Sequence, residues 1–158
     1  MSTIADYQGR KFDILAFQPK EYTAELQQAI AADSSGGLIC TGIQKLAQRW
    51  VLEFLTPTDS MPYKIGRGSS FIPNVRSGKL RNNVDVVSFF SAASEEVGVN
   101  LTNEDTVSDP ADERYASVTL DGFSLNGDGK LVLEVTLLSA AGLTRQVILP
   151  ISVSAGLI

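Results

Sequence analysis

The chain has 158 residues, of which 44% are hydrophobic and 20% charged, and its formal net charge is −5. This length and composition are typical of a soluble globular protein with a single core, so we expect one domain over residues 1–158. The acidic balance argues against nucleic-acid binding over the whole surface. No stretch approaches the roughly 18 uncharged apolar residues that cross a membrane, and residues 1–11 lack the apolar run of a signal peptide. We therefore expect a protein that is synthesised in the cytoplasm and binds neither nucleic acid nor a membrane.

The chain contains no histidine and a single cysteine, Cys40. Catalytic sites of the Ser-His-Asp and Cys-His types are thus excluded, and a zinc site would have one cysteine plus carboxylates. We expect Cys40 to be a small buried side chain. The sequence "GRGSSF" at residues 66–71 lacks the third glycine of a dinucleotide-binding loop, and no Walker pattern occurs. We predict no catalytic residue, no cofactor and no metal site.

The N-terminal part predicts one strand and one helix. Residues 12–17, "FDILAF", are typical of a short strand. Tyr22, Leu26 and Ile30 recur at helical spacing and predict a helix over residues 21–32. "SSGG" at residues 34–37 ends it.

The strongest helical pattern lies in "LICTGIQKLAQRWVLEFLTP", residues 38–57. Thr41 and Gln44 have the spacing of an N-terminal capping box. Pro57 ends the helix, because the residue before a proline is pushed out of the α region. The apolar stripe consists of Ile43, Leu46, Ala47, Trp50, Val51 and Phe54.

Two charged segments of opposite sign follow. Residues 57–82 contain three prolines and three glycines and predict a long irregular basic loop. A helix is expected over residues 83–97, with Val84, Val87, Phe90 and Ala93 facing inward and Gly98 as its stop. An acidic loop is expected at residues 99–113. The basic side chains are Lys64, Arg67, Arg76, Lys79 and Arg81.

From Tyr115 onward apolar residues alternate with polar ones, which predicts strands. The alternation changes phase at Asp121-Gly122 and so indicates a β-bulge. "NGDG" at residues 126–129 predicts a hairpin turn, and its spacing does not fit a calcium loop. "AAG" at residues 140–142 predicts the next turn, and Pro150 favours an edge position for the last strand. The inward faces are Leu131, Leu133, Val135 and Leu137, and then Val147, Leu149, Ile151 and Val153.

These elements predict an α+β fold, with about three helices packed on an antiparallel sheet and a three-stranded meander at the C-terminus. An enzymatic alternative remains open. Glu96 and Asp105 are nine residues apart, a spacing found in some phage-type lysozymes, which cleave glycosidic bonds with two carboxylates. Ala111 stands where those enzymes carry a threonine.

The order of these signals resembles the sheath-initiator family of contractile phage baseplates, also called the tail-lysozyme-like wedge family. The family's Gln- and Arg-rich helix runs into "LLTP", as "GIQKLAQRWVLEFLTP" does here. A Gly- and Pro-containing loop ending in Gly-Ser follows, with Pro62, Gly68 and Ser69 at its positions. The family's acid-Pro-Arg motif is present as Asp112-Glu113-Arg114, without the proline. The resemblance covers roughly residues 38–153.

The resemblance implies a structural, non-enzymatic protein in the virion, at the tail baseplate. Its partners would be the sheath protein, baseplate wedge proteins and tail tube or hub proteins, with several copies around a six-fold axis. Asp112 and Arg114 would dock on the helical core of the wedge, and the basic loop on neighbouring chains. The last strand would pair with extended arms of the sheath through its main chain. The residues expected to contact partners are Asp112, Arg114, Arg76, Lys79, Arg81, Gln146, Val147, Ile148, Leu149 and Ile151.

Three alternatives remain open at this point. The last strand could be covered by the protein's own N-terminus instead of by a partner. The chain could be a peptidoglycan-cleaving lysozyme. It could also be a general α+β interaction module outside this family.

Overall fold

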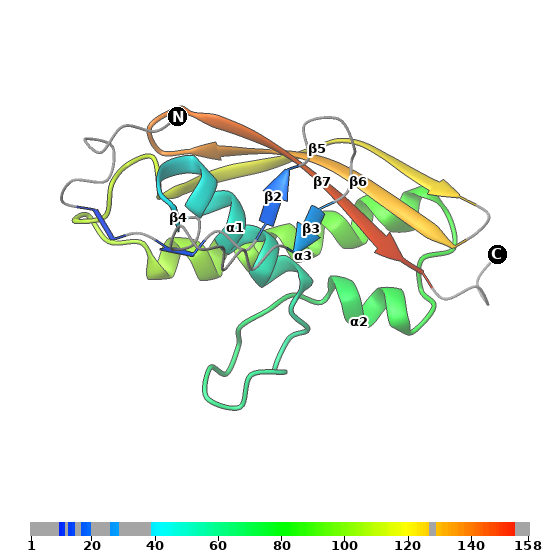
Figure 1. The fold of residues 1–158 in the computed structure, drawn as a ribbon. Coiled ribbons are helices and arrows are strands. Elements are labelled where there is room, and N and C mark those ends of the chain that lie inside the picture. The colour runs from blue at the N-terminus through cyan, green and yellow to red at the C-terminus, as the bar shows by residue number, and fades with distance from the viewer. Residues whose placement is uncertain are drawn as a thin grey trace.

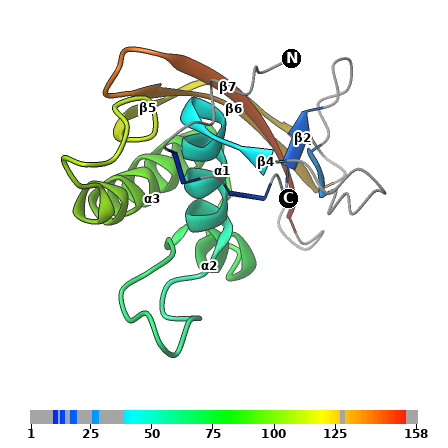
Figure 2. The same cartoon turned by 60° about the vertical axis from the view of Figure 1, so that its left-hand side comes forward.

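The computed structural model describes residues 10–11, 13–14, 17–19, 26–28, 39–126 and 129–153. Strands β5 (Tyr115–Asn126), β6 (Lys130–Ser139) and β7 (Thr144–Ser152) form an antiparallel sheet in the order β5-β6-β7. Helices α1 (Gly42–Leu55), α2 (Phe71–Arg76) and α3 (Asn83–Glu104) lie on one face of this sheet (Figures 1 and 2). The α+β fold with its C-terminal meander is therefore confirmed.

Helix α1 forms the centre of the core. Its predicted stripe is buried except for Ile43, which is partly exposed. Trp50 and Phe54 stack with ring centroids 4.7 Å apart, and Phe54 also meets Phe71 of α2 at 4.8 Å. The helix ends as predicted before Pro57, because Thr56 is extended and its amide closes the last turn on Leu52.

Helix α3 is longer than predicted and turned differently about its axis. Val84 and Val87 are 76% and 48% exposed, so their inward placement was wrong, whereas Val86 is fully buried. The buried set runs on to Leu101 with Val86, Phe90, Ala93 and Val97, and this longer apolar face determines the orientation. Gly98 does not stop the helix. A Cβ there would lie 3.0 Å from the Tyr115 ring, so the glycine allows close packing of β5 on α3.

Both charged segments are more ordered than predicted. Residues 57–82 contain α2, whose Phe71 and Val75 are fully or nearly buried against α1 and α3. Two apolar side chains one turn apart are too few to predict a helix, but they suffice when a core receives them. The acidic segment begins inside α3, because residues 99–104 are helical and only the remainder to 113 is a loop.

The sheet matches its predicted pattern. The register shifts between Leu120 and Gly122, which is the predicted bulge, and Gly129 donates to the Asn126 carbonyl at the first turn. Residues 127–128 of that turn lie outside the described residues. The predicted inward faces of β6 and β7 are all buried. Strand β7 is an outer strand of the sheet, as Pro150 indicated.

The described N-terminal pieces are short antiparallel pairs. Strand β1 (Asp13–Ile14) pairs with β4 (Ile39–Cys40), and β2 (Phe17–Pro19) pairs with β3 (Leu26–Gln28). The predicted strand over 12–17 is thus divided between β1 and β2. The predicted helix over 21–32 is wrong at residues 26–28, where pairing with β2 overrides the helical spacing. Its other residues, and the predicted stop at 34–37, lie outside the described residues.

Cys40 is buried, as predicted, and is a free thiol. Burial, followed by the charge of Asp13, raises the pKa of this thiol to about 11. In the described part of the chain, no helix combines the length and apolar character needed to cross a membrane.

Candidate partner-binding surfaces

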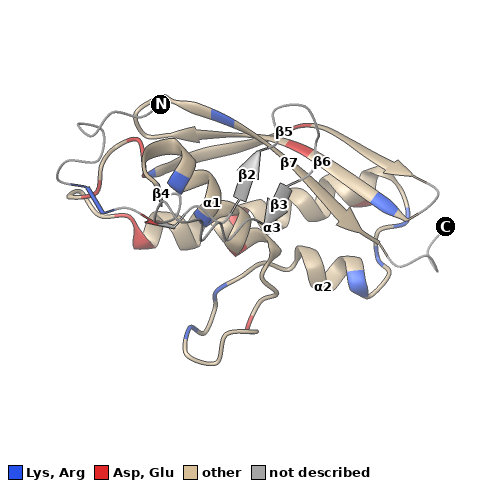
Figure 3. Cartoon of the chain, viewed as in Figure 1, with Lys and Arg blue, Asp and Glu red and all other residues tan. Residues whose placement is uncertain are grey.

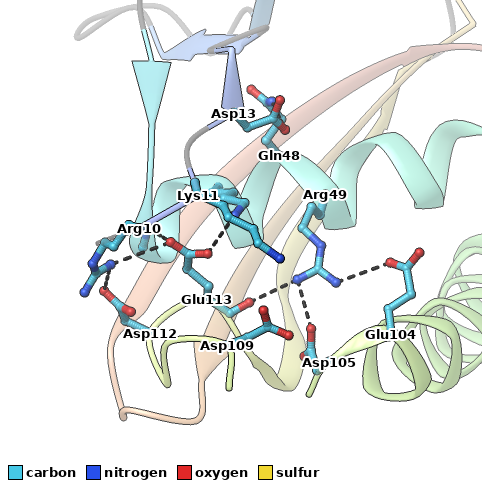
Figure 4. A network of polar contacts seen from close by, with 12 residues as sticks. Arg10, Lys11, Asp13, Gln48, Arg49, Glu104, Asp105, Asp109, Asp112 and Glu113 are labelled. Carbon is cyan, nitrogen blue, oxygen red and sulfur yellow. Dashed lines mark hydrogen bonds and ion pairs between the residues drawn. The ribbon is translucent and has the colours of Figure 1, made fainter. Parts of the chain in front are cut away.

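A row of charged side chains follows one side of α1. Lys45, Arg49 and Glu53 are spaced by four residues and so lie on the same side of the helix. Each of them pairs with a segment distant in the sequence: Lys45 with Glu113, Arg49 with Glu104 and Asp105, and Glu53 with Arg67. Figure 4 shows the part of this network around Arg49 and Glu113. These ion pairs therefore attach both the 57–69 loop and the loop at residues 105–113 to α1.

Glu113 caps α1. One carboxylate oxygen accepts the Gly42 amide at 3.1 Å, and the other meets the Lys45 ammonium at 2.7 Å. The residue is only 3% exposed. Thr41 does occupy the N-cap position, but its side chain makes no capping bond, so the predicted capping box is wrong. A carboxylate delivered from a distant loop takes its place, which local spacing could not indicate.

The two sequence neighbours of Glu113 differ in their side-chain contacts. Asp112 accepts from the Arg10 guanidinium at 2.8 Å, with its side chain 19% exposed. Arg114 is partly buried, and its Nε has no partner among the described residues. Both predicted docking residues thus lie at the edge of the network. The sequence prediction missed Glu113, which has the internal structural role in this motif.

The Arg49 guanidinium joins α1 to the end of α3. It donates to Asp105 at 2.9 Å and to the Glu113 carbonyl at 3.1 Å, and it pairs with Glu104 at 3.3 Å. Burial alone would raise the pKa of Glu104, but hydrogen bonds and charge from Arg67 and then Arg49 outweigh it and hold that pKa below its usual value. Protonation of Glu104 in acid should therefore weaken its ion pairs with Arg49 and Arg67.

Glu53 anchors the long loop. Its buried carboxylate accepts the Gly68 amide at 2.8 Å, the Asn100 amide at 2.9 Å and the Arg67 guanidinium at 2.8 Å. At the same place the Ser69 amide donates to the Thr56 carbonyl at 2.8 Å, which joins the two ends of the loop. The base of the loop is therefore held by several hydrogen bonds, although its sequence contains no regular pattern.

The far end of this loop is exposed and apolar. Residues 57–69 project away from the sheet and helices (Figures 1 and 2). Tyr63 is 97% and Ile65 is 89% exposed, and Met61 is also exposed. Side chains of this size rarely face water together without a partner. We call Met61, Tyr63 and Ile65 the loop tip.

The predicted basic docking residues lie at the end of α2 and in the segment that follows it. Arg76, in the last turn of α2, and Lys79 and Arg81, which follow it, are exposed. Figure 3 shows Lys and Arg positions in blue at the end of α2 and in the segment after it. Arg67 differs, because it is bonded to Glu53 and Glu104. We call Arg76, Lys79 and Arg81 the basic surface, whereas Lys64 is exposed in the 57–69 loop.

The predicted docking residues of β7 divide into two sets. Val147, Leu149 and Ile151 are buried in the core, so their side chains are not open to a partner. Gln146 is exposed and Ile148 partly exposed on the other face. Strand β3 contacts β7, which agrees with the alternative that the N-terminal part covers this strand.

The two candidate catalytic carboxylates lie apart and are bonded internally. Glu96 accepts the Ser70 amide at 2.7 Å, and Asp105 accepts the Tyr115 amide at 2.7 Å. Glu96 lies in α3 and Asp105 is its C-cap residue, so nine residues of helix, a rise of about 13 Å, separate their main chains. Glycosidase carboxyl groups are about 5–9.5 Å apart. Within the described residues, no three His, Cys, Asp or Glu side chains cluster as metal ligands would.

Comparison with protein-family models, curated proteins and solved structures finds no match for this chain.

Proposed function

We propose that the protein is a non-enzymatic structural part of a contractile phage baseplate, where it joins the wedge to the sheath and nucleates sheath assembly. The observation that supports this most is the loop at residues 57–69, which is anchored at its base by Glu53 and exposes the loop tip. An anchored loop loses little conformational entropy on binding, so its apolar side chains favour association. The family resemblance supplies the identity of the partners.

The wedge contact would use the basic surface. Its exposed charges contribute little to stability, so they are free to serve recognition and association rate. The sheath contact would use the main chain of β7 with Gln146 and Ile148, whose side chains face away from the core. Asp112 and Arg114 would contribute from the edge of the α1 network.

Co-purification with the wedge proteins of the same genome tests this proposal. The triple variant Arg76→Glu, Lys79→Glu, Arg81→Glu should lose wedge binding, and Lys130→Glu on the sheet should keep it. Circular dichroism should be unchanged in both. Equal wedge binding by the triple variant would reject the basic surface as the contact.

The lysozyme alternative is tested separately. We expect the folded, purified chain to release no fragments from peptidoglycan, because each of its two candidate carboxylates accepts a main-chain amide and their main chains are separated by nine residues of helix. Release that is lost in Glu96→Gln or Asp105→Asn would establish the enzyme instead.

A further inference from the structure

The two outer strands of the sheet differ in how well their core-facing side chains are covered. On β7, Val147, Leu149 and Ile151 are 9%, 1% and 8% exposed. On β5, the corresponding row is only partly buried along its length: Val118, Leu120, Phe123 and Leu125. Strand β7 contacts α1 and β3 as well as β6, whereas β5 contacts β6 and α3. The side of the sheet at β5 is therefore the less covered one.

A groove lies between β5 and α3. It has a volume of about 390 Å³, and its apolar lining includes Val118 and Leu120 from β5 and Val87 and Phe90 from α3. Ser94 also lines it and is 7% exposed, yet its hydroxyl has no partner among the described residues. Buried hydroxyl groups are normally hydrogen-bonded, so this one is available to a polar group that enters the groove.

The exposed valines of α3 extend the apolar surface beside the groove. Val87 lines the groove, and Val84 lies one turn earlier on the same side of the helix. They are 48% and 76% exposed. The sequence pattern predicted both valines in the core, whereas the structure leaves both of them exposed.

The main chain of β5 favours an extended occupant. Within the described residues, β5 pairs only with β6. The first residues are partly occupied, since the Tyr115 amide donates to Asp105 and the Tyr115 hydroxyl bonds to the Val118 backbone. From Leu120 to Asn126 the outer edge carries the alternating donors and acceptors that another strand can pair with.

Charge indicates which strand would fit. Glu95 lines the groove, and no lysine or arginine is among the residues that line it. Asp121 and Glu134 are exposed on the opposite face of the sheet, where Asp121 accepts from the Thr119 and Thr136 hydroxyls. Antiparallel pairing of two β5 strands about their centres would bring Asp121 of each copy close to the other. Like charges in that position destabilise a sheet, so a second copy is disfavoured and a basic segment is favoured.

We infer that the outer edge of β5, with the groove it forms with α3, binds an extended segment of a partner protein in which apolar residues alternate with lysine or arginine. The apolar side chains enter the groove between Leu120 and Val87, and the basic ones, which alternate with them, lie on the opposite face of the sheet near Asp121. The segment adds a fourth strand to the sheet. This surface is separate from the basic surface and from β7, and it does not depend on the baseplate assignment.

The test uses the full chain and a short fluorescent peptide that alternates valine and lysine. Fluorescence anisotropy should give saturable binding, at least about ten-fold tighter than for a peptide alternating valine and glutamate. A peptide of the same composition, with all valines before all lysines, should bind as weakly as the acidic one. Hydrogen exchange should slow, when the basic peptide is present, at those amides of residues 120–126 that point away from β6.

Two variants of α3 locate the site. Val87→Lys places a charge in the groove and should weaken peptide binding about ten-fold or more. Ser88→Lys, at the next exposed position, adds the same charge outside the lining residues and should leave binding within about two-fold. Both positions are exposed, so both variants should fold like the parent protein.

Several outcomes would overturn the inference. These are equal binding of the three peptides, slowed exchange at β7 instead of β5, or an unchanged affinity in Val87→Lys. Slow exchange, without peptide, of the amides in residues 120–126 that point away from β6 would also overturn it. If that protection rose with protein concentration, a second copy of the chain would be the occupant. If it were independent of concentration, a segment of the same chain would occupy the edge of β5.

Discussion

The Glu53 carboxylate and the Arg67 guanidinium meet at 2.8 Å, and this pair joins α1 to the returning side of the long loop. Glu53 is 5% exposed and also receives the Gly68 and Asn100 amides. This buried carboxylate thus makes three of the hydrogen bonds that hold the base of the loop. A substitution at Glu53 therefore tests the stability of the loop without changing the exposed side chains of the loop tip.

Glu53→Gln should lower the free energy of unfolding by about 2 kcal/mol, because it leaves Arg67 and the Gly68 amide with weaker acceptors. Urea unfolding followed by circular dichroism measures this. Glu95→Gln, at an exposed position of α3, should change stability by less than about 0.5 kcal/mol. Trypsin should also cut after Lys64 faster in Glu53→Gln than in the parent protein. Equal stability of the two variants would mean that Glu53 does not anchor the loop.

Two glycines in the loop form a matched pair. Gly68 has a φ of +95°, and a Cβ there would lie 2.5 Å from the Thr56 carbonyl oxygen. Gly66 has a φ of +81° with nothing within 4 Å. Gly66→Ala should therefore cost only the backbone strain, about 1 kcal/mol, and Gly68→Ala should cost more than about 2 kcal/mol. Urea midpoints compare them, and equal losses would show that the base of the loop can shift.

The adjacent acids Asp112 and Glu113 should differ sharply. Glu113→Ala removes the cap of α1 and the partner of Lys45, and should cost about 3 kcal/mol. Asp112→Ala breaks a more exposed pair with Arg10 and should cost at most about 1 kcal/mol. Thermal and urea unfolding provide the comparison. A larger loss of stability in Asp112→Ala than in Glu113→Ala would show that Asp112, and not Glu113, has the main structural role.

Acid should weaken the junction between Arg49, Arg67 and Glu104. The pKa of Glu104 is lower in the folded chain than in the unfolded one, so its contribution is present above the ordinary value of about 4.3 and is lost as the pH falls through the folded value. Glu104→Gln should therefore show a smaller loss of stability than the parent protein between about pH 5 and pH 3. Urea midpoints across this range measure it. Parallel pH profiles for the two proteins would contradict the assignment.

The fold could be predicted where apolar periodicity is regular. The stripe of α1, the inward faces of β6 and β7 and the bulge at Asp121-Gly122 follow from local spacing alone. The orientation of α3 could not be predicted, because Val84 and Val87 offer a plausible inward face and only packing against β5 selects Val86 and Phe90. The strand at residues 26–28 likewise depends on pairing with a segment outside its own sequence window.

The candidate surfaces were predicted only in part. The exposed positions of Arg76, Lys79 and Arg81 follow from their place in a polar segment. The burial of Val147, Leu149 and Ile151 also follows from alternation, and it restricts any partner on β7 to the main chain and the opposite face. The anchoring by Glu53 and the capping by Glu113 each join residues far apart in the sequence, which no local pattern reveals.

This burial also determines how the C-terminus can be tested. Ile151 and Val153 belong to the core, and the Val153 amide donates to the Gly129 carbonyl. A chain truncated after Pro150 would lose those contacts and confuse unfolding with loss of binding. A chain ending at Val153 keeps them, and it is the variant to use when residues 154–158 are tested for sheath attachment.

The most direct test of the proposed function is sheath assembly in the presence and absence of this protein. The sheath and wedge proteins from the same genome would be co-expressed with the parent chain, with the Tyr63→Ser, Ile65→Ser variant, or without either. Size-exclusion chromatography and negative-stain imaging would then measure assembly. The account predicts ordered sheath on wedges only with the parent chain, and markedly less with the loop-tip variant. Equal sheath assembly without the chain would contradict it.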